Sequence, residues 1–328
     1  MDMAFKNNFD FFRLIAATMV LVSHQFPLSG LVEPLLLPGT SFGTIAVEIF
    51  FVISGYLIAK SWSHDPHLVH FFIKRFLRLT PALVMVTLVT VFILGPLNSI
   101  LPINEYFSNK TTWQYLSNIY LDIRYGLPGV FNHNPLPNYV NGSLWSLPLE
   151  AQWYGIVAIL GLVRVIRFPI ILFSIFGYLV WWEYQHLVIT HLPGITSLWY
   201  MGIFFSAGIV LTTVTISKII YFTVALICLV LFILDYWFFA NVIFLPMSVI
   251  YFGTQDFSLI GNWGKWGDIS YGIYLFAFPV QQSVVNFLGV STPFLALLGI
   301  SLLVTYFLAY CSWRWIESPA LKLKRLVN

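Results

Sequence analysis

The sequence predicts an all-α, polytopic membrane protein of about ten transmembrane helices, with both termini in the cytoplasm. Composition is the first reason: hydrophobic residues make up 59% of the chain and charged residues only 9%, where a soluble domain carries roughly 25% charged residues. The second reason is a series of apolar stretches of about 20 residues, the length that crosses a bilayer as a helix. The third is the uneven distribution of Lys and Arg among the connections between these stretches.

Each apolar stretch is taken as one span, and all of them together as one integral membrane domain over residues 1–328. The stretch that contains Pro246 is short, so it is tilted, broken or re-entrant, and a total of nine or eleven spans is the alternative. The expected spans cover residues 9–27, 42–60, 79–99, 143–163, 168–186, 196–214, 218–238, 240–254, 268–289 and 293–315.

The basic residues fix the orientation. If the N-terminus is cytoplasmic, the outer connections keep only Lys110 and Arg124, as the positive-inside rule requires. The same orientation places both termini inside and residues 100–142 outside. The inner side then collects Lys6, Lys60, Lys74, Arg75, Arg78, Arg164, Arg167, Lys218, Lys265, Lys322, Lys324 and Arg325.

The outer connection over residues 100–142 is long, and long irregular loops are uncommon without a function. It is rich in Asn, Pro, Gly, Tyr and Trp. Such aromatic and amide side chains suit stacking on sugar rings and hydrogen bonding to their hydroxyls. A folded cap over the outer surface is an equally good interpretation.

Arg13 and His24 lie at the two ends of one apolar run. Their separation of eleven positions corresponds to about three full helical turns and about 16 Å along the axis, so both side chains share one face. Arg13 is expected near the cytoplasmic surface and His24 in the outer third of the bilayer. The alternatives are that Arg13 reaches the inner headgroups or pairs with Asp10, and that His24 is a polar interfacial residue.

Further polar groups are expected at the depth of His24. Glu48 and Glu150 lie a few residues below the outer surface in two other spans, without a basic neighbour in sequence. Buried charges need partners, and His24 is the candidate cation at that level. Gln281 reaches the same depth. The alternative to a functional site is polar contact between helices.

A basic cluster, Lys74, Arg75 and Arg78, directly precedes the third expected span. It either holds the loop inside or grips an anionic ligand, because arginine binds phosphate with two parallel hydrogen bonds. No metal site is expected: the histidines at positions 64, 67 and 70 are interrupted by Pro66 and lack a matching cluster of Cys or carboxylate ligands. The two cysteines sit in apolar runs, which argues against a disulfide scaffold.

Six segments, in order along nearly the whole chain, resemble the acyltransferase-3 family of integral membrane acyltransferases. They are FDFFRLIAATMVLVSH, VEIFFVISGYLI, KRFLRLTPAL, VNGSLWSLPLEAQWY, GDISYGIYLFAFPV and RWIESPA. The resemblance implies about ten helices and transfer of an acyl group, usually acetyl, from acyl-CoA to extracytoplasmic glycans. Members often have a histidine in the segment that matches YLFAFPV, where this chain has Ala277, which leaves His24 as the membrane histidine best placed for chemistry.

The resemblance and the spacing together predict one site. His24 is the expected general base, and Glu150 the carboxylate that orients its imidazole; acylation of His24 itself is the alternative route. The phosphates of acyl-CoA are expected at Arg13, Lys74, Arg75 and Arg78. The acceptor is expected to contact Glu48, Asn141, Ser143, Trp145, Tyr154 and Gln281.

The expected partners are therefore acyl-CoA, most simply acetyl-CoA, and a glycan or lipid-linked saccharide, with membrane lipid around the protein. Neither a metal nor nucleic acid is expected, and the expected location is the bacterial cytoplasmic membrane. Two other functions fit the same polar residues: a transporter or flippase for a lipid-linked glycan, and a noncatalytic subunit of a polysaccharide synthase. The sequence shows no repeated halves, which many transporters have.

Overall fold

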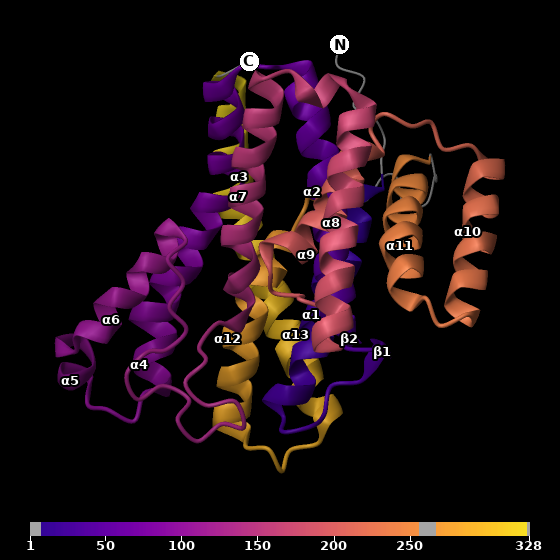
Figure 1. The fold of residues 1–328 in the computed structure, drawn as a ribbon. Helices are drawn as coiled ribbons and strands as arrows, with labels where there is room; N and C mark the ends of the chain where they lie inside the picture. The colour runs from indigo at the N-terminus through magenta and orange to yellow at the C-terminus, as the bar shows by residue number, and fades with distance from the viewer. Residues whose placement is uncertain (1–7, 256–266, 327–328) are drawn as a thin grey trace. The chain divides into compact units, whose positions relative to one another are not determined.

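The computed structural model describes residues 8–255 and 267–326, and in this part of the chain the protein is nearly all-α (Figure 1). The only described strands, β1 (Leu35–Leu37) and β2 (Thr40–Ser41), form a short antiparallel pair. Of the basic residues expected inside, Lys6 and Lys265 lie outside the described residues, as does the side chain of Arg325.

The α-helices follow one another along the chain, with short 3-10 or π-helical segments (η) at several ends. They are α1 (Phe9–Leu28), α2 (Phe42–His64), α3 (Leu68–Val89), η1 (Thr90–Leu94), α4 (Gly95–Asn98), α5 (Ile103–Ser108), α6 (Lys110–Gln114), η2 (Tyr115–Tyr120), η3 (Gly142–Trp145), α7 (Ser146–Leu162), η4 (Val165–Arg167), α8 (Pro169–Thr190), α9 (Leu198–Val210), α10 (Lys218–Ile233), α11 (Trp237–Thr254), α12 (Ser270–Leu288), α13 (Phe294–Ser312), η6 (Trp313–Glu317), α14 (Ser318–Lys322) and η7 (Leu323–Leu326).

Helices occupy each of the ten stretches expected to cross the membrane, but not all of them are long and apolar enough to do so. Within the described residues, five stretches qualify by length and composition: Phe9–Leu28, Phe42–His64, Leu68–Asn98, Trp237–Thr254 and Phe294–Lys322. By contrast, α9 has 13 residues, about 20 Å of helix, which is less than the roughly 30 Å of a bilayer core. The ten crossings and the cytoplasmic termini therefore stay predictions.

One helix boundary differs clearly from the sequence-based expectation. α3 begins at Leu68, not near residue 79, so the basic cluster lies inside this helix and not in a loop before it. Its three charges made the stretch look too polar for a span, yet a helix can continue below an apolar run when its charged side chains reach the interface. The helix also passes through Pro81.

The chain forms two compact units, each assembled from separate stretches. Unit 1 comprises residues 1–16, 35–71 and 149–266, and unit 2 comprises residues 17–34, 72–148 and 267–328.

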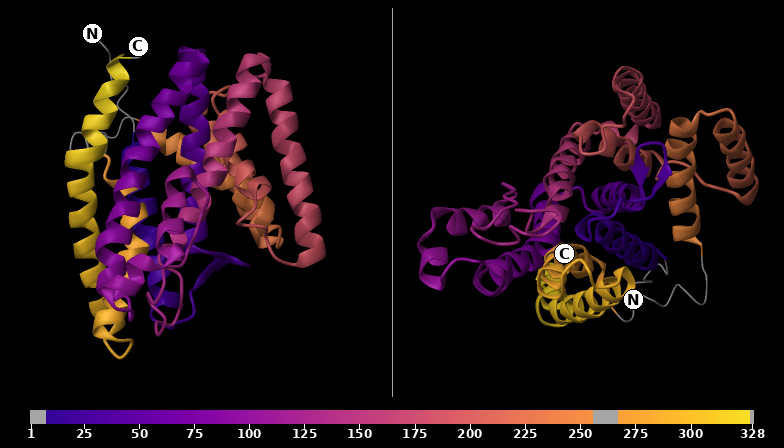
Figure 2. Two further views of the ribbon diagram at one scale, coloured as in Figure 1. Left: turned by 90° about the vertical axis from the view of Figure 1, so that its left-hand side faces the viewer. Right: turned by 90° about the horizontal axis from the view of Figure 1, so that it is seen from below.

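In unit 1, the contact between α2 and α9 depends on glycine. A side chain at Gly55 of α2 would overlap the Phe205 backbone, and one at Gly208 of α9 would overlap the Val52 carbonyl. Small residues let two helix backbones approach closely, which replaces the hydrophobic driving force that is missing within lipid. In the same unit, α10 and α11 lie side by side, coloured orange (Figures 1 and 2).

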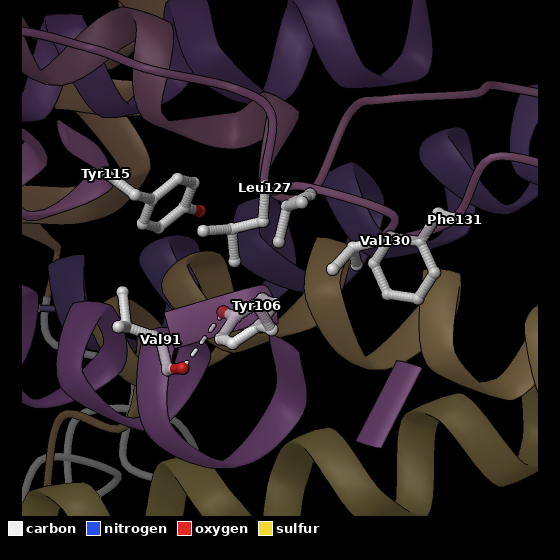
Figure 3. Close-up of a cluster of buried hydrophobic side chains, with 7 residues drawn as sticks. Val91, Tyr106, Tyr115, Leu127, Val130 and Phe131 are labelled. Atoms are coloured by element: carbon white, nitrogen blue, oxygen red, sulfur yellow. Dashed lines mark hydrogen bonds between the residues drawn. The ribbon is translucent and has the colours of Figure 1, made fainter. Parts of the chain in front are cut away.

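In unit 2, α12 packs along α13, and residues 100–142 fold around a core of their own. Gly272 of α12 lies against Ala309 of α13. The separate core includes Tyr106 and Tyr115, and the Tyr106 hydroxyl donates a 3.0 Å hydrogen bond to the Val91 carbonyl (Figure 3). The remaining members of this core are Val91, Leu127, Val130, Phe131 and Val140. Residues 100–142 are thus a folded segment with buried side chains, and their role in binding sugars stays a prediction.

Candidate functional site

The predicted site residues divide between the two units. Arg13, Glu48, Glu150 and Tyr154 belong to unit 1. The other residues belong to unit 2: His24, Lys74, Arg75, Arg78, Asn141, Ser143, Trp145 and Gln281. The predicted partners His24 and Glu150 are therefore members of different units, and their pairing stays a prediction.

His24 is held in unit 2 by aromatic packing. Its ring meets Phe278 of α12 edge-on, with 5.2 Å between ring centroids and 76° between planes. The Phe278 ring also packs against Gly142 of η3, where a Cβ would come within 2.6 Å of the ring. The buried Nδ1 atom of His24 has no hydrogen-bond partner among the described residues. The imidazole is thus oriented by packing, with no hydrogen bond to Nδ1 among the described residues.

Gln281 joins α12 to the helix that carries His24. Its Nε2 donates to the Leu21 carbonyl at 2.8 Å and to Gln25 Oε1 at 2.9 Å. Gln281 is fully buried, and its Oε1 has no partner within the described chain. One end of the amide therefore fixes α1 against α12, while the other end offers an acceptor.

Asn141 and Ser143 begin the helical turn that leads into α7. The Asn141 Oδ1 accepts from the Ser143 backbone N at 3.2 Å, and its Nδ2 donates to the Leu275 carbonyl at 2.9 Å. The Tyr274 hydroxyl donates to the Ser143 carbonyl at 2.7 Å. The Ser143 Oγ is fully buried and unpartnered among the described residues. Asn141 thus caps η3 and ties it to α12, whereas the contact of the Ser143 hydroxyl with an acceptor stays a prediction.

Trp145 is the last residue of η3 and is half-buried. Ser146 follows it, and its hydroxyl lies 2.7 Å from the Tyr274 hydroxyl. Since Tyr274 uses its single proton on the Ser143 carbonyl, Ser146 is the donor in this pair.

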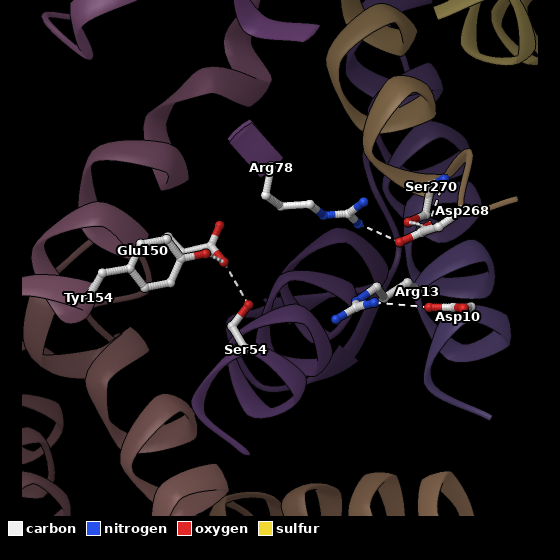
Figure 4. Close-up of polar contacts among 8 residues, drawn as sticks. All are labelled: Asp10, Arg13, Ser54, Arg78, Glu150, Tyr154, Asp268 and Ser270. Atoms are coloured by element: carbon white, nitrogen blue, oxygen red, sulfur yellow. Dashed lines mark hydrogen bonds and ion pairs between the residues drawn. The ribbon is translucent and has the colours of Figure 1, made fainter. Parts of the chain in front are cut away.

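Glu150, in unit 1, receives two hydroxyl groups on one oxygen. Ser54 Oγ donates to Glu150 Oε1 at 2.6 Å, and Tyr154 Oη donates to the same atom at 2.5 Å (Figure 4). No described residue bonds to its other carboxylate oxygen. Tyr154 thus donates to Glu150, and its expected contact with the acceptor stays a prediction. Sequence reasoning missed Ser54, whose only signal is a hydroxyl within the apolar run of α2.

Glu48 has a different environment in the same unit. It is fully buried, and both of its oxygens are used: Tyr200 Oη donates to Oε1 at 2.6 Å and Asn241 Nδ2 donates to Oε2 at 3.0 Å. Neither donor is charged. Hydrogen bonds from α9 and α11 therefore satisfy the carboxyl group, and its pairing with His24, a member of the other unit, stays a prediction.

The predicted donor site contains arginines that already have acidic partners. Arg13 pairs with Asp10 at 3.0 Å in unit 1, as the alternative interpretation of this arginine held (Figure 4). In unit 2, Arg78 pairs with the buried carboxylate of Asp268, which also accepts from Ser270 (Figure 4). Sequence reasoning missed Asp268, although it stands beside Ser270 in the segment GDISYGIYLFAFPV.

The rest of the basic cluster lies on α3. Arg75 is buried, with 8% of its surface exposed, and Lys74 is half-buried. The Arg78 guanidinium also lies 5.9 Å from the centroid of the Tyr271 ring, within the range of a cation–π contact. A phosphate at Arg78 would therefore share this guanidinium with Asp268.

A protein-family model described as an acyltransferase domain matches residues 6–314. The chain belongs to this acyltransferase family. The match covers nearly the whole chain and includes every predicted site residue, so the family resemblance found in the sequence is confirmed.

Curated relatives of this acyltransferase include the O-acetyl transferase of Shigella phage Sf6, which is 33% identical over 95% of both chains. The peptidoglycan O-acetyltransferase OatA of Listeria monocytogenes is 27% identical over 85% of this chain and 51% of the relative. Nodulation protein 10 of Rhizobium leguminosarum bv. viciae is 33% identical over 45% of this chain and 42% of the relative. No solved structure matches the chain.

Proposed function

We propose that this acyltransferase is a multi-pass protein of the bacterial cytoplasmic membrane that moves an acetyl group from cytoplasmic acetyl-CoA to a hydroxyl of an extracytoplasmic or lipid-linked glycan. The observation that carries the proposal is the likeness to the phage O-acetyl transferase over 95% of both chains. The transport alternative has no comparable support, because relatives matched over most of this chain bear acyl-transfer names.

The proposed chemistry starts at His24. The imidazole takes the proton of the acceptor hydroxyl as that oxygen attacks the carbonyl carbon of the thioester. The tetrahedral intermediate then expels the thiolate of CoA, which leaves as a thiol after it takes the proton from the imidazolium. In the other route a ring nitrogen of His24 attacks the thioester and expels the CoA thiolate, which takes the imidazole proton; the acceptor hydroxyl then attacks the acyl-imidazole and gives its proton to the departing ring nitrogen. Both routes need a ring nitrogen that protein groups leave open, and the Nδ1 of His24 supports this.

Two other groups have proposed roles in the same step. The Ser143 hydroxyl donates to the oxyanion of the tetrahedral intermediate, and a single donor of this kind lowers the activation free energy by roughly 3 kcal/mol. Its burial without a partner in the described chain supports this role. Glu150, positioned by Ser54 and Tyr154, stabilises the charged form of His24.

The proposed donor site uses cations of α3. Lys74, Arg75 and Arg78 bind the phosphates of acyl-CoA, with Arg13 as an additional cation. Arginine suits this role because its planar guanidinium forms two parallel hydrogen bonds to phosphate. A bound phosphate competes with Asp268 for Arg78.

The test is a reconstituted transfer reaction. Purified protein in lipid vesicles is given radiolabelled acetyl-CoA and surface glycan from cells that lack the gene, and both labelled glycan and free CoA thiol are measured. The proposal predicts label in the glycan that depends on His24. Intact protein that transports glycan but leaves acetyl-CoA unchanged would support the flippase alternative.

A further inference from the structure

Two tyrosines of residues 100–142 form an exposed aromatic pair. The rings of Tyr125 and Tyr139 have centroids 5.2 Å apart and planes tilted by 41°. Tyr139 is 42% exposed and Tyr125 is partly exposed. Their backbones are joined as well, because the N–H of Val140 donates to the Tyr125 carbonyl at 2.7 Å. Folding therefore leaves part of a large apolar surface in contact with solvent.

This pair differs from the other tyrosines of the segment. Tyr106 and Tyr115 are fully buried in the separate core. Tyr120 is 84% exposed and has no ring neighbour among the described residues. Tyr125 and Tyr139 are neither core residues nor isolated surface residues, so core packing does not account for them.

A buried glutamine on α12 fixes the backbone below Tyr139. Gln282 donates from Nε2 to the Tyr139 carbonyl at 2.7 Å and to the Leu136 carbonyl at 2.8 Å. Asn134 donates in turn to the Gln282 side chain at 2.7 Å and to its carbonyl at 2.9 Å. These four bonds hold residues 134–139 against α12, so the aromatic pair has a fixed position before any ligand binds.

The same helix links the pair to His24. Gly142 follows Tyr139 by three positions and packs on Phe278, whose ring contacts His24. Three residues span at most about 11 Å even when fully extended, so the Cα of Tyr139 lies within that distance of the Cα of Gly142. Every residue in this chain of contacts belongs to unit 2.

We propose that Tyr125 and Tyr139 form a saccharide-binding subsite that holds the acceptor glycan next to His24. The proposal rests on the proposed function, which it deepens by naming where the acceptor binds. An aromatic ring stacks on the apolar face of a sugar while its hydroxyl bonds to the sugar's polar edge. The exposed residues Asn132, His133 and Asn138 supply further hydrogen-bonding groups in the same segment.

The protonation state of the pair suits this role. Burial raises the pKa of the Tyr125 phenol above its ordinary value, and the neighbouring Tyr139 raises this pKa further. The phenol therefore remains a neutral hydroxyl that both donates and accepts across the physiological pH range.

The test uses Tyr139→Ala, Tyr139→Phe and the control Tyr120→Ala in the reconstituted transfer reaction. The acceptor probe is surface glycan from cells that lack the gene. Tyr139→Ala should raise the KM for glycan about tenfold, the effect of losing about 1.4 kcal/mol of stacking. The KM for acetyl-CoA should not change. Tyr139→Phe should keep most of the affinity because the ring remains, and Tyr120→Ala should match the unchanged protein.

Glycan binding by equilibrium dialysis separates this inference from the proposed function. If the unchanged protein transfers acetyl but Tyr139→Ala and Tyr125→Ala both keep its KM for glycan, the subsite is elsewhere and the function stands. Tyr139-dependent binding without any transfer would uphold the subsite and overturn the function. A protein that neither binds glycan nor transfers acetyl would overturn both.

Discussion

Glu48 and Glu150 are similar in sequence context, but the structure gives them different surroundings. Both are glutamates in apolar helices of unit 1. Glu48 accepts hydrogen bonds on both oxygens, from Tyr200 and Asn241, whereas Glu150 accepts both of its bonds on Oε1. A carboxylate whose oxygens are both occupied by neutral donors joins helices, whereas one with an oxygen left open can still meet a second group. From this comparison we expect Glu48 to act mainly in stability, and Glu150 remains the carboxylate of the proposed chemistry.

The largest expected effect is at His24, the proposed general base, whose charged form Glu150 stabilises. His24→Ala should lower transfer about 10³-fold, within the range that general acid–base catalysis contributes. Binding of acetyl-CoA should persist, since the proposed phosphate site lies on α3. Transfer of labelled acetyl to the glycan measures the first effect, and equilibrium dialysis with acetyl-CoA measures the second. Substantial transfer by a folded His24→Ala protein would show that the imidazole is not the base.

A smaller effect is expected at the donor site. Arg78→Lys keeps a positive charge beside Asp268, so the protein should fold. Lysine cannot form the two parallel hydrogen bonds that a guanidinium makes to phosphate. The KM for acetyl-CoA should rise about tenfold, because hydrogen bonds to charged groups are worth roughly 1.5–3 kcal/mol. The same change at Arg124, an exposed arginine of residues 100–142, serves as the control. Equal KM values for acetyl-CoA in the unchanged, Arg78→Lys and Arg124→Lys proteins would show that Arg78 pairs with Asp268 but does not bind the donor.

A substitution at Gly142 tests whether the packing of Phe278 sets the orientation of the His24 ring. Gly142→Ala places a methyl group within 2.6 Å of the Phe278 ring, so the ring and the imidazole must shift. Overpacking of this kind costs roughly 1–3 kcal/mol of stability, and transfer should fall several-fold at an unchanged donor KM. Gly155→Ala is the matched control because a Cβ there meets no atom within 4 Å. If both variants behave alike in thermal unfolding and transfer, the packing of Phe278 does not position His24.

The smallest effect on transfer is expected at Glu48. Glu48→Gln should keep transfer within about threefold of the unchanged protein but reduce the free energy of unfolding by roughly 1–3 kcal/mol, because its amide must present a donor where Tyr200 or Asn241 also donates. Tyr200→Phe should show the same pattern. A steep loss of transfer without a loss of stability would place Glu48 in the reaction.

Sequence reasoning found the helices more readily than the partners of their polar residues. The apolar run between Arg13 and His24 is one continuous helix, α1, because local composition decides where a helix lies in lipid. The start of α3 at Leu68 was missed because three charges follow it closely.

The partners were missed for a different reason. Nothing local in the sequence relates Ser54 to Glu150 or Tyr200 to Glu48, positions that are 96 and 152 residues apart. Which hydroxyl meets which carboxylate depends on how the helices pack, and small residues such as Gly55 and Gly208 set that packing without any polar signal.

The measurement that tests the central claim most directly is a double-mutant cycle on acetyl transfer with His24→Ala and Glu150→Gln. If Glu150 serves the imidazole, Glu150→Gln alone should lower transfer steeply. The double variant should then be hardly slower than His24→Ala, because residues that act as one unit are not additive. Losses that multiply in the double variant would contradict the account and show that Glu150 acts independently of His24.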